Sequence, residues 1–229
     1  PTATATDSLT VSYGTGLPGC SPSTVYTTSV TVRPAGYWLG DSSANWGLNA
    51  NWCGNVPLAT TAVVIPSGAT YNPSITSGTY PSASITIQSG ATLTVSSSTL
   101  RIAGAISNSG TFTASSGTIE LNGTAAQTIP ASTFTSNTLG GLIANNSAGV
   151  TLSGTLYVSG IVKVTTGTLY TGDHLTLKSD ATQTALIDGS GSGEVSGNVT
   201  VQRYLDSAYG YRYVSSPFSS STVSNFSGL

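Results

Sequence analysis

A repeat with a period of about 20 residues, in the middle of the chain, constrains its fold more than any other feature. Three apolar residues recur one period later, because Ile85 is followed by Ile106, Leu93 by Phe112, and Leu100 by Ile119. Each period contains three short strand-like runs, and this pattern is typical of a three-faced coil whose strands stack about 4.8 Å apart. We therefore predict a parallel β-helix over residues 62–205, with roughly six turns between Ile85 and Tyr204.

The local pattern supports strands throughout the chain. Apolar residues alternate with Thr, Ser, Gln and Lys, and no run of ten or more residues has the helical period of 3.6. Glycines punctuate the runs and are expected to permit positive φ at the corners: Gly90, Gly110, Gly117, Gly154 and Gly167. An up-and-down barrel is the alternative fold, but it does not require three strands per period.

The regions that flank the repeat have different compositions. Residues 1–35 contain two alternating runs joined by a Gly- and Pro-rich loop, and they resemble the last strands of a β-sandwich. Residues 36–61 form an aromatic segment that we expect to be a cap or linker. Residues 206–229 depart from the repeat, and we interpret them as the start of a following module or as a C-terminal cap.

The aromatic segment contains all three tryptophans, Trp38, Trp46 and Trp52. The first turn of a coil stack has no neighbour on one side, so it needs an apolar cover. The preferred interpretation is that these rings form this N-terminal cap. The alternative is a platform that binds sugars, which would require exposed ring faces.

Few residues are charged: six Lys and Arg against eight Asp and Glu. Such a balance creates no field that would attract nucleic acid or an anionic membrane. Hydroxyl and amide groups must keep the surface hydrated, which suits an extracellular protein. The chain contains no Met, which suggests that it is a mature fragment, and it contains two cysteines, Cys20 and Cys53. These two are compatible with one disulfide in an oxidising compartment, either with each other or with residues outside the fragment.

Several phrases resemble large surface proteins of gliding-type bacteria that are exported by the type IX secretion system. Trp38 to Trp46 reads Trp-x-Gly-x-x-Ser-x-x-Trp and is followed by Asn51-Trp52-Cys53-Gly54-Asn55-Val56-Pro57. Ile87 to Val95 matches the repeat phrase I-x-S-G-A-T-L-T-V, and Tyr211 to Pro217 matches a closing phrase of these proteins. The segment with Gly19-Cys20-Ser21-Pro22 is similar to the end of their immunoglobulin-like repeats.

The resemblance implies an adhesin or filament component that is secreted to the bacterial cell surface and carries a C-terminal sorting domain downstream. Its partners would be the secretion machinery of the outer membrane and a surface polysaccharide or another cell-surface ligand, and self-association is compatible with it. The usual second Cys of the coil region is missing, which favours pairing of Cys20 with Cys53 or with an upstream residue. Short Asp-Ser motifs resemble O-glycosylation sites of such bacteria, and we hypothesise that Ser8 and Ser207 carry glycans.

The sequence contains no pattern that indicates catalysis. The acids in the late repeats, Asp173, Asp180, Asp188 and Glu194, have spacings that do not match the coil period. We therefore expect no catalytic residue, no metal site and no cofactor. The predicted function is a structural or adhesive stalk; the alternatives are a carbohydrate-binding module and a β-helix enzyme that degrades polysaccharide.

Overall fold

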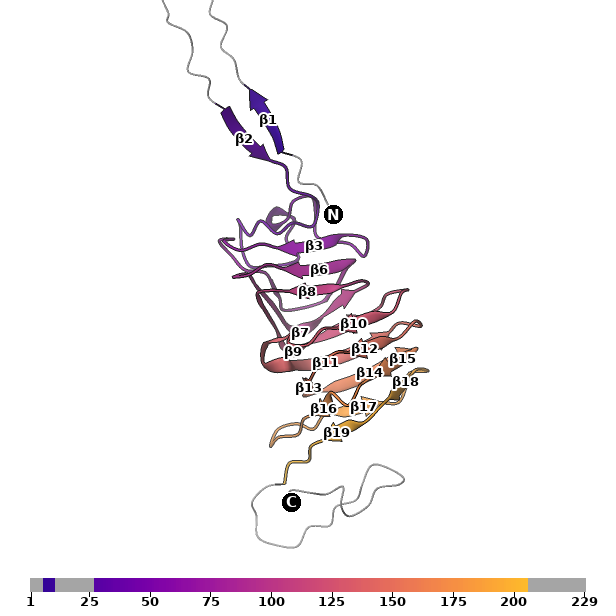
Figure 1. The fold of residues 1–229 in the computed structure, drawn as a ribbon. Helices are drawn as coiled ribbons and strands as arrows, with labels where there is room; N and C mark the ends of the chain where they lie inside the picture. Colours follow the sequence, from indigo (N-terminus) through magenta and orange to yellow (C-terminus); the bar gives the residue numbers. More distant parts are fainter. Residues whose placement is uncertain (1–5, 11–26, 206–229) are drawn as a thin grey trace, which may run out of the picture.

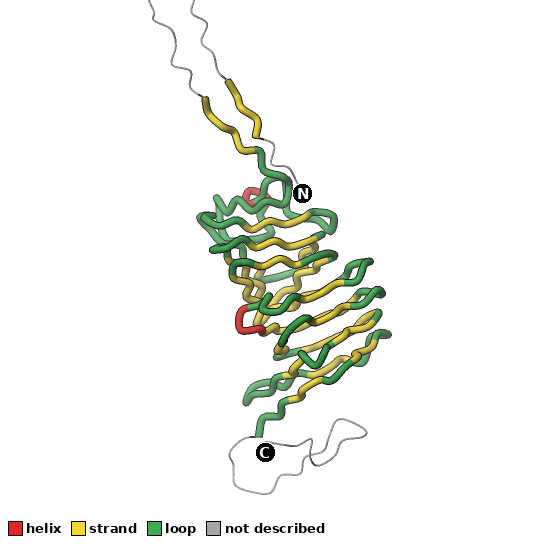
Figure 2. Tube along the Cα trace, viewed as in Figure 1, coloured by secondary structure: helices red, strands yellow, loops and turns green. Residues whose placement is uncertain are grey.

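The computed structural model describes residues 6–10 and 27–205, and its architecture is an all-β, parallel β-helix of about seven turns (Figure 1). The chain winds repeatedly around one apolar core, and each turn adds short strands to three faces. Two short 3-10 helices interrupt the strands, η1 (Asn49–Asn51) and η2 (Thr135–Asn137) (Figure 2). None of the described helices is long and apolar enough to cross a membrane.

One face, which we call face A, consists of a three-stranded and a four-stranded parallel sheet. The first sheet contains β3 (Ala62–Ile65), β6 (Ser84–Ile87) and β8 (Ile106–Asn108). The second contains β10 (Gln127–Ile129), β12 (Val150–Leu152), β15 (Thr168–Tyr170) and β18 (Glu194–Ser196). The six strands from β6 onward agree with the six turns predicted after Ile85, and β3 adds one more.

A single ten-stranded sheet forms the other two faces, because several of its strands bend around a corner. Face B contains the first halves of three long strands together with β4 (Ser74–Ile75), β13 (Leu156–Val158), β16 (Leu175–Leu177) and β19 (Val199–Val201). Face C contains the second halves together with β5 (Thr79–Ser82), β14 (Ile161–Thr166) and β17 (Leu186–Asp188). The strands that bend are β7 (Thr92–Ile102), β9 (Thr111–Leu121) and β11 (Thr138–Asn145).

The strand register confirms the repeat that the sequence predicts. Ile85 pairs with Ile106, Leu93 with Phe112, and Leu100 with Ile119, all in parallel. Each of these side chains points inward and is buried. Alternate positions point outward, because successive side chains of a strand lie on opposite faces of the sheet.

Glycines allow consecutive turns to approach closely at the corners, but only partly in the way expected. Gly90 and Gly167 have positive φ, of 81° and 74°, whereas Gly110, Gly117 and Gly154 do not. A Cβ at Gly110 would overlap the carbonyl oxygen of Ala91 in the preceding turn. The expectation of positive φ was therefore wrong at these three corners. Glycine is needed there because the preceding turn leaves no room for a Cβ atom.

Face A is interrupted between β8 and β10, where Figure 1 shows the lower strands displaced from the upper ones. The side chain of Gln127 occupies an inward position of β10 and bridges the interruption. Its Nε2 donates to the carbonyl oxygens of Ile102 and Gly104, at 2.9 and 3.0 Å. Its Oε1 accepts from the Gly123 amide at 2.7 Å and from Asn146 Nδ2 at 2.9 Å. Four hydrogen bonds from one buried amide thus replace the missing backbone ladder.

Two features precede the coil stack. Strands β1 (Thr6–Thr10) and β2 (Thr27–Thr31) pair antiparallel, as the two predicted runs of residues 1–35 require, but the predicted immunoglobulin-like domain remains a prediction. The aromatic segment adds an incomplete turn over the first coil, because Tyr37 bridges to Val64 and Asn45 bridges to Ser74, both in parallel.

Candidate functional site

The three tryptophans are buried together at the N-terminal end of the core. The ring centroids of Trp38 and Trp52 lie 4.8 Å apart and those of Trp46 and Trp52 lie 4.6 Å apart, both in edge-to-face geometry. Trp38 Nε1 donates to the carbonyl oxygen of Tyr71 at 2.7 Å. None of the three rings has a free face, so the sugar-platform alternative is wrong for these residues.

Asn51 holds the loop that carries these rings, and the sequence analysis missed it. Its fully buried side chain accepts from the amides of Ser42 and Ser43 at 3.1 Å. It also donates to the carbonyl oxygen of Asn45 at 2.9 Å. Asn51 therefore pairs with backbone groups of the irregular loop over residues 42–45, where no strand partner satisfies them.

The other predicted site residues fall partly outside the described chain. Cys53 is partly exposed, its thiol lies 2.9 Å from the carbonyl oxygen of Arg33, and it forms no disulfide within residues 27–205. Its predicted partner Cys20 and the predicted glycan site Ser207 lie outside the described residues. Ser8 lies in β1, in register with Ser29 of β2.

The four late acids lie on different parts of the coil. Asp188 belongs to face C and Glu194 to face A, whereas Asp173 and Asp180 lie in the turns on either side of β16. Asp180 accepts from the amides of Thr182 and Gln183. Within the described part of the chain, no three potential metal ligands among His, Cys, Asp and Glu are grouped together.

A hollow with a volume of about 540 Å³ lies at the corner between faces B and C. It forms at Gly140 and Gly141 of β11. Gly141 lies between the outward-pointing residues Thr118 and Ile161 of the neighbouring turns and has no side chain to fill the space between them. We call this hollow the β11 groove; its lining residues are Ser115, Ser116, Thr118, Gly140, Gly141, Ile143, Ser159, Gly160, Ile161, Lys163, Gln183 and Asp188.

The charges at the β11 groove neutralise each other. Lys163 Nζ lies 3.3 Å from Asp188 Oδ2 and donates to Ser190 Oγ at 2.7 Å. The pKa of Asp188 lies below its ordinary value, chiefly because the Ser190 amide donates to its Oδ1 and further because of the Ser190 hydroxyl and Lys163. The groove therefore presents mainly serine hydroxyls and exposed backbone groups to a ligand, and these groups suit a neutral polar molecule.

The carboxylate of Asp188 should make stability depend on acid pH. A depressed pKa in the folded state stabilises the fold above the unfolded value of 3.8, and this contribution disappears as pH falls through the folded pKa. Because water screens this surface ion pair, Asp188→Asn should lower the melting temperature only slightly at pH 7. The difference from the wild type should shrink below pH 3.8. Thermal unfolding followed by circular dichroism from pH 7 to pH 2 measures this, with exposed Asp41→Asn as the control; a difference that stays constant below pH 3.8 would contradict it.

A second ion pair lies farther up face C and was also missed. Arg101 Nε donates to Glu120 Oε2 at 2.6 Å, and Asn145 Nδ2 donates to Glu120 Oε1 at 3.1 Å. Arg101 and Glu120 occupy paired positions of β7 and β9. Their separation in the sequence equals that of Leu100 and Ile119, so the repeat itself contained the signal that they are neighbours.

Part of the chain matches a protein family. Residues 37–126 match a family model that is described as a domain of unknown function (DUF8693). The match begins in the aromatic segment and ends directly before Gln127, at the interruption of face A. No curated protein and no solved structure matches the chain.

Proposed function

We propose that this chain is a structural or adhesive segment of a secreted, multi-domain bacterial cell-surface protein, in which the β-helix acts as a stiff spacer or adhesion stalk. One observation carries the proposal. The ten-stranded sheet continues from β4 to β19 and links all its turns through backbone hydrogen bonds. A stack that is closed by neutral backbone bonds resists bending and is little affected by salt.

The surface chemistry supports an extracellular location. Because the chain has only six basic and eight acidic residues, the outward rows are mainly Thr, Ser and Asn, whose hydration does not change with pH. The resemblance to surface proteins of gliding-type bacteria motivates export through the type IX machinery as part of this proposal. We further propose that the segment is not an enzyme. Its late acids lie on separate faces, where Asp180 accepts hydrogen bonds within its turn and Asp188 forms an ion pair with Lys163.

A second candidate function is binding of neutral polysaccharide. The β11 groove favours it, since the groove is hollow, rich in hydroxyl groups and electrically neutral. The apolar side chain of Ile161 is exposed at its rim and could pack against a sugar ring. Ile161→Asp should then abolish retention on a neutral polysaccharide column, whereas Tyr170→Asp, on face A, should not.

The stalk proposal predicts that stiffness is needed for adhesion under flow. In the surface protein that carries this segment, residues 62–205 would be replaced by a Gly/Ser linker of about 30 residues, whose mean span matches a rod of about 30 Å. Cells that display the linker variant should detach at lower shear than cells that display the native segment. Equal surface display, measured with an antibody, is the control. Equal attachment of the two strains would contradict a role for stiffness.

A further inference from the structure

Gly141 is a glycine that the backbone does not require. Its φ is not positive, and it lies inside β11, where glycine weakens a strand. The neighbouring Gly140 differs, because a Cβ atom there would lie 2.7 Å from the Ser116 carbonyl carbon. At Gly141 a Cβ atom would lie closest to the rotatable Thr118 hydroxyl, and the nearest backbone atom, the Ile161 carbonyl oxygen, would be 3.3 Å away. A glycine inside a strand often marks a place where a ligand approaches the backbone closely.

The other positions of this outward row show which residue the fold would accept. Thr79 pairs with Thr99, and Thr99 pairs with Thr118, in parallel register. Three β-branched side chains thus stand side by side in this row, one in each turn. A β-branched residue would therefore also fit in place of Gly141. Because glycine stands there instead, a slot two strand separations wide, about 9.6 Å, opens between Thr118 and the next turn.

The ion pair that lines the groove can still bind a ligand. Lys163 Nζ has three N–H donors, of which one can serve Asp188 Oδ2 and one Ser190 Oγ. Among the described residues the third donor has no partner. Two hydroxyl groups on adjacent carbon atoms match this pair, because one can donate to the carboxylate while the other accepts from the ammonium group.

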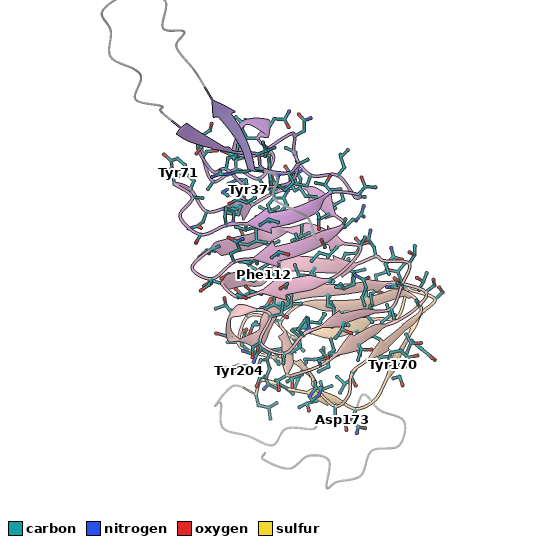
Figure 3. All side chains as sticks on the ribbon, turned by 45° about the horizontal axis from the view of Figure 1, so that its top comes forward. Tyr37, Tyr71, Phe112, Tyr170, Asp173 and Tyr204 are labelled. Carbon is teal, nitrogen blue, oxygen red and sulfur yellow. The ribbon has the colours of Figure 1, made fainter. Side chains whose placement is uncertain are left out.

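An apolar contact lies beside these polar groups, because Ile161 is 52% exposed at the groove. Exposed aromatic rings do not gather into a second platform in the described chain, since Tyr71, Tyr170 and Tyr204 lie far apart (Figure 3). The groove extends from β9 across β11 and β14 to β17, a distance of three strand separations or about 14 Å. Its volume of about 540 Å³ lies in the range of ligand sites. It is therefore long enough for a segment of a sugar chain.

We propose that the β11 groove binds neutral polysaccharides whose sugar rings carry free hydroxyl groups on adjacent carbon atoms. One ring enters the slot at Gly141 and packs against Ile161, and adjacent hydroxyl groups of the chain bind Lys163 and Asp188. This inference rests on the second candidate function, binding of neutral polysaccharide. It adds which sugars bind and which residues select them.

Soluble neutral polysaccharides test the hydroxyl requirement. Dextran and galactomannan carry adjacent free hydroxyl groups along their chains, whereas residues inside the 1,3-linked glucan laminarin do not. In affinity electrophoresis of the full chain, dextran or galactomannan should bind at least about tenfold more tightly than laminarin. Equally tight binding of laminarin would overturn the proposal.

Filling the slot tests the role of Gly141. Gly141→Val places there the kind of side chain that the rest of the row carries, so it should weaken binding by about tenfold without lowering the melting temperature. Gly140→Val should lower the melting temperature, because its Cβ atom would overlap the backbone at Ser116. If Gly141→Val lowered it equally, the glycine would be structural and the proposal would be wrong.

Replacement of Lys163 tests the ion pair. Lys163→Met keeps the length of the side chain but removes its donors, so binding should weaken by about tenfold. Lys178→Met, in the turn after β16, is the matched control and should bind as the wild type does.

Ile161→Asp separates this inference from the second candidate function. If Ile161→Asp abolished binding while Gly141→Val and Lys163→Met bound as tightly as the wild type, the groove would bind polysaccharide but not in the proposed manner. If the wild type bound none of the three polysaccharides, the second candidate function would itself be contradicted, and this inference with it.

Discussion

Replacement of Gln127 by leucine should lower the free energy of unfolding by about 3–5 kcal/mol. Leucine has nearly the size of glutamine, but it cannot pair with the four groups that the amide satisfies. These groups belong to Ile102, Gly104, Gly123 and Asn146, and all lie within 3.0 Å of the Gln127 amide. The Gly123 amide and the Gly104 carbonyl oxygen lose their side-chain partner, at a cost of about 1–3 kcal/mol each, whereas the Ile102 carbonyl oxygen keeps the Asn122 amide and Asn146 Nδ2 keeps the Ala125 carbonyl oxygen. Unfolding in urea, followed by circular dichroism, measures the change.

An exposed glutamine provides the matched control. Gln88 lies in the turn after β6 and its side chain is exposed, so Gln88→Leu should change the stability by less than about 0.5 kcal/mol. Equal effects of the two substitutions would show that the Gln127 network does not hold the two halves of face A together. The DUF8693 match ends directly before Gln127. Gln127→Leu therefore also tests whether this network joins the matched turns to the unmatched ones.

The regular turns could be predicted from the sequence because three apolar rows recur at nearly constant spacing. The pairing of Leu93 with Phe112 and of Leu100 with Ile119 follows directly from one shared offset. The next step, from Ala114 to Leu139, is longer because η2 and its loop are inserted. The spacing between paired apolar residues changes at this insertion, so the repeat can no longer be followed in the sequence there.

The period of the apolar residues could not predict which polar residues lie inside the coil. Gln127 occupies an inward position that the repeat reserves for an apolar side chain, and only its contacts with the preceding turn make it stable there. The β11 groove was also unpredictable, because it depends on Gly141 lying between Thr118 and Ile161 of neighbouring turns. The tryptophan cluster was more accessible, because three large rings so close together in the sequence need a common core.

Truncation of Trp46 should have an effect as large as that of Gln127→Leu. The ring is fully buried and contacts Trp38 and Trp52, with centroid distances of 6.5 and 4.6 Å. Trp46→Ala should lower the free energy of unfolding by about 3–5 kcal/mol, because it leaves a cavity at the end of the core that the flanking rings cannot fill. The measurement is again unfolding in urea, and Leu58→Ala, at an exposed position, is the control.

Two phenylalanine substitutions separate the packing of these rings from their hydrogen bonds. Trp46 Nε1 is buried without a hydrogen-bond partner among the described residues, whereas Trp52 Nε1 donates to the Trp46 carbonyl oxygen at 2.7 Å. Both substitutions remove the same atoms, but only Trp52→Phe leaves a buried carbonyl unpaired. Trp52→Phe should therefore cost about 1–2 kcal/mol more than Trp46→Phe. If the order were reversed, the indole of Trp46 would have to contribute a polar contact that this packing does not contain.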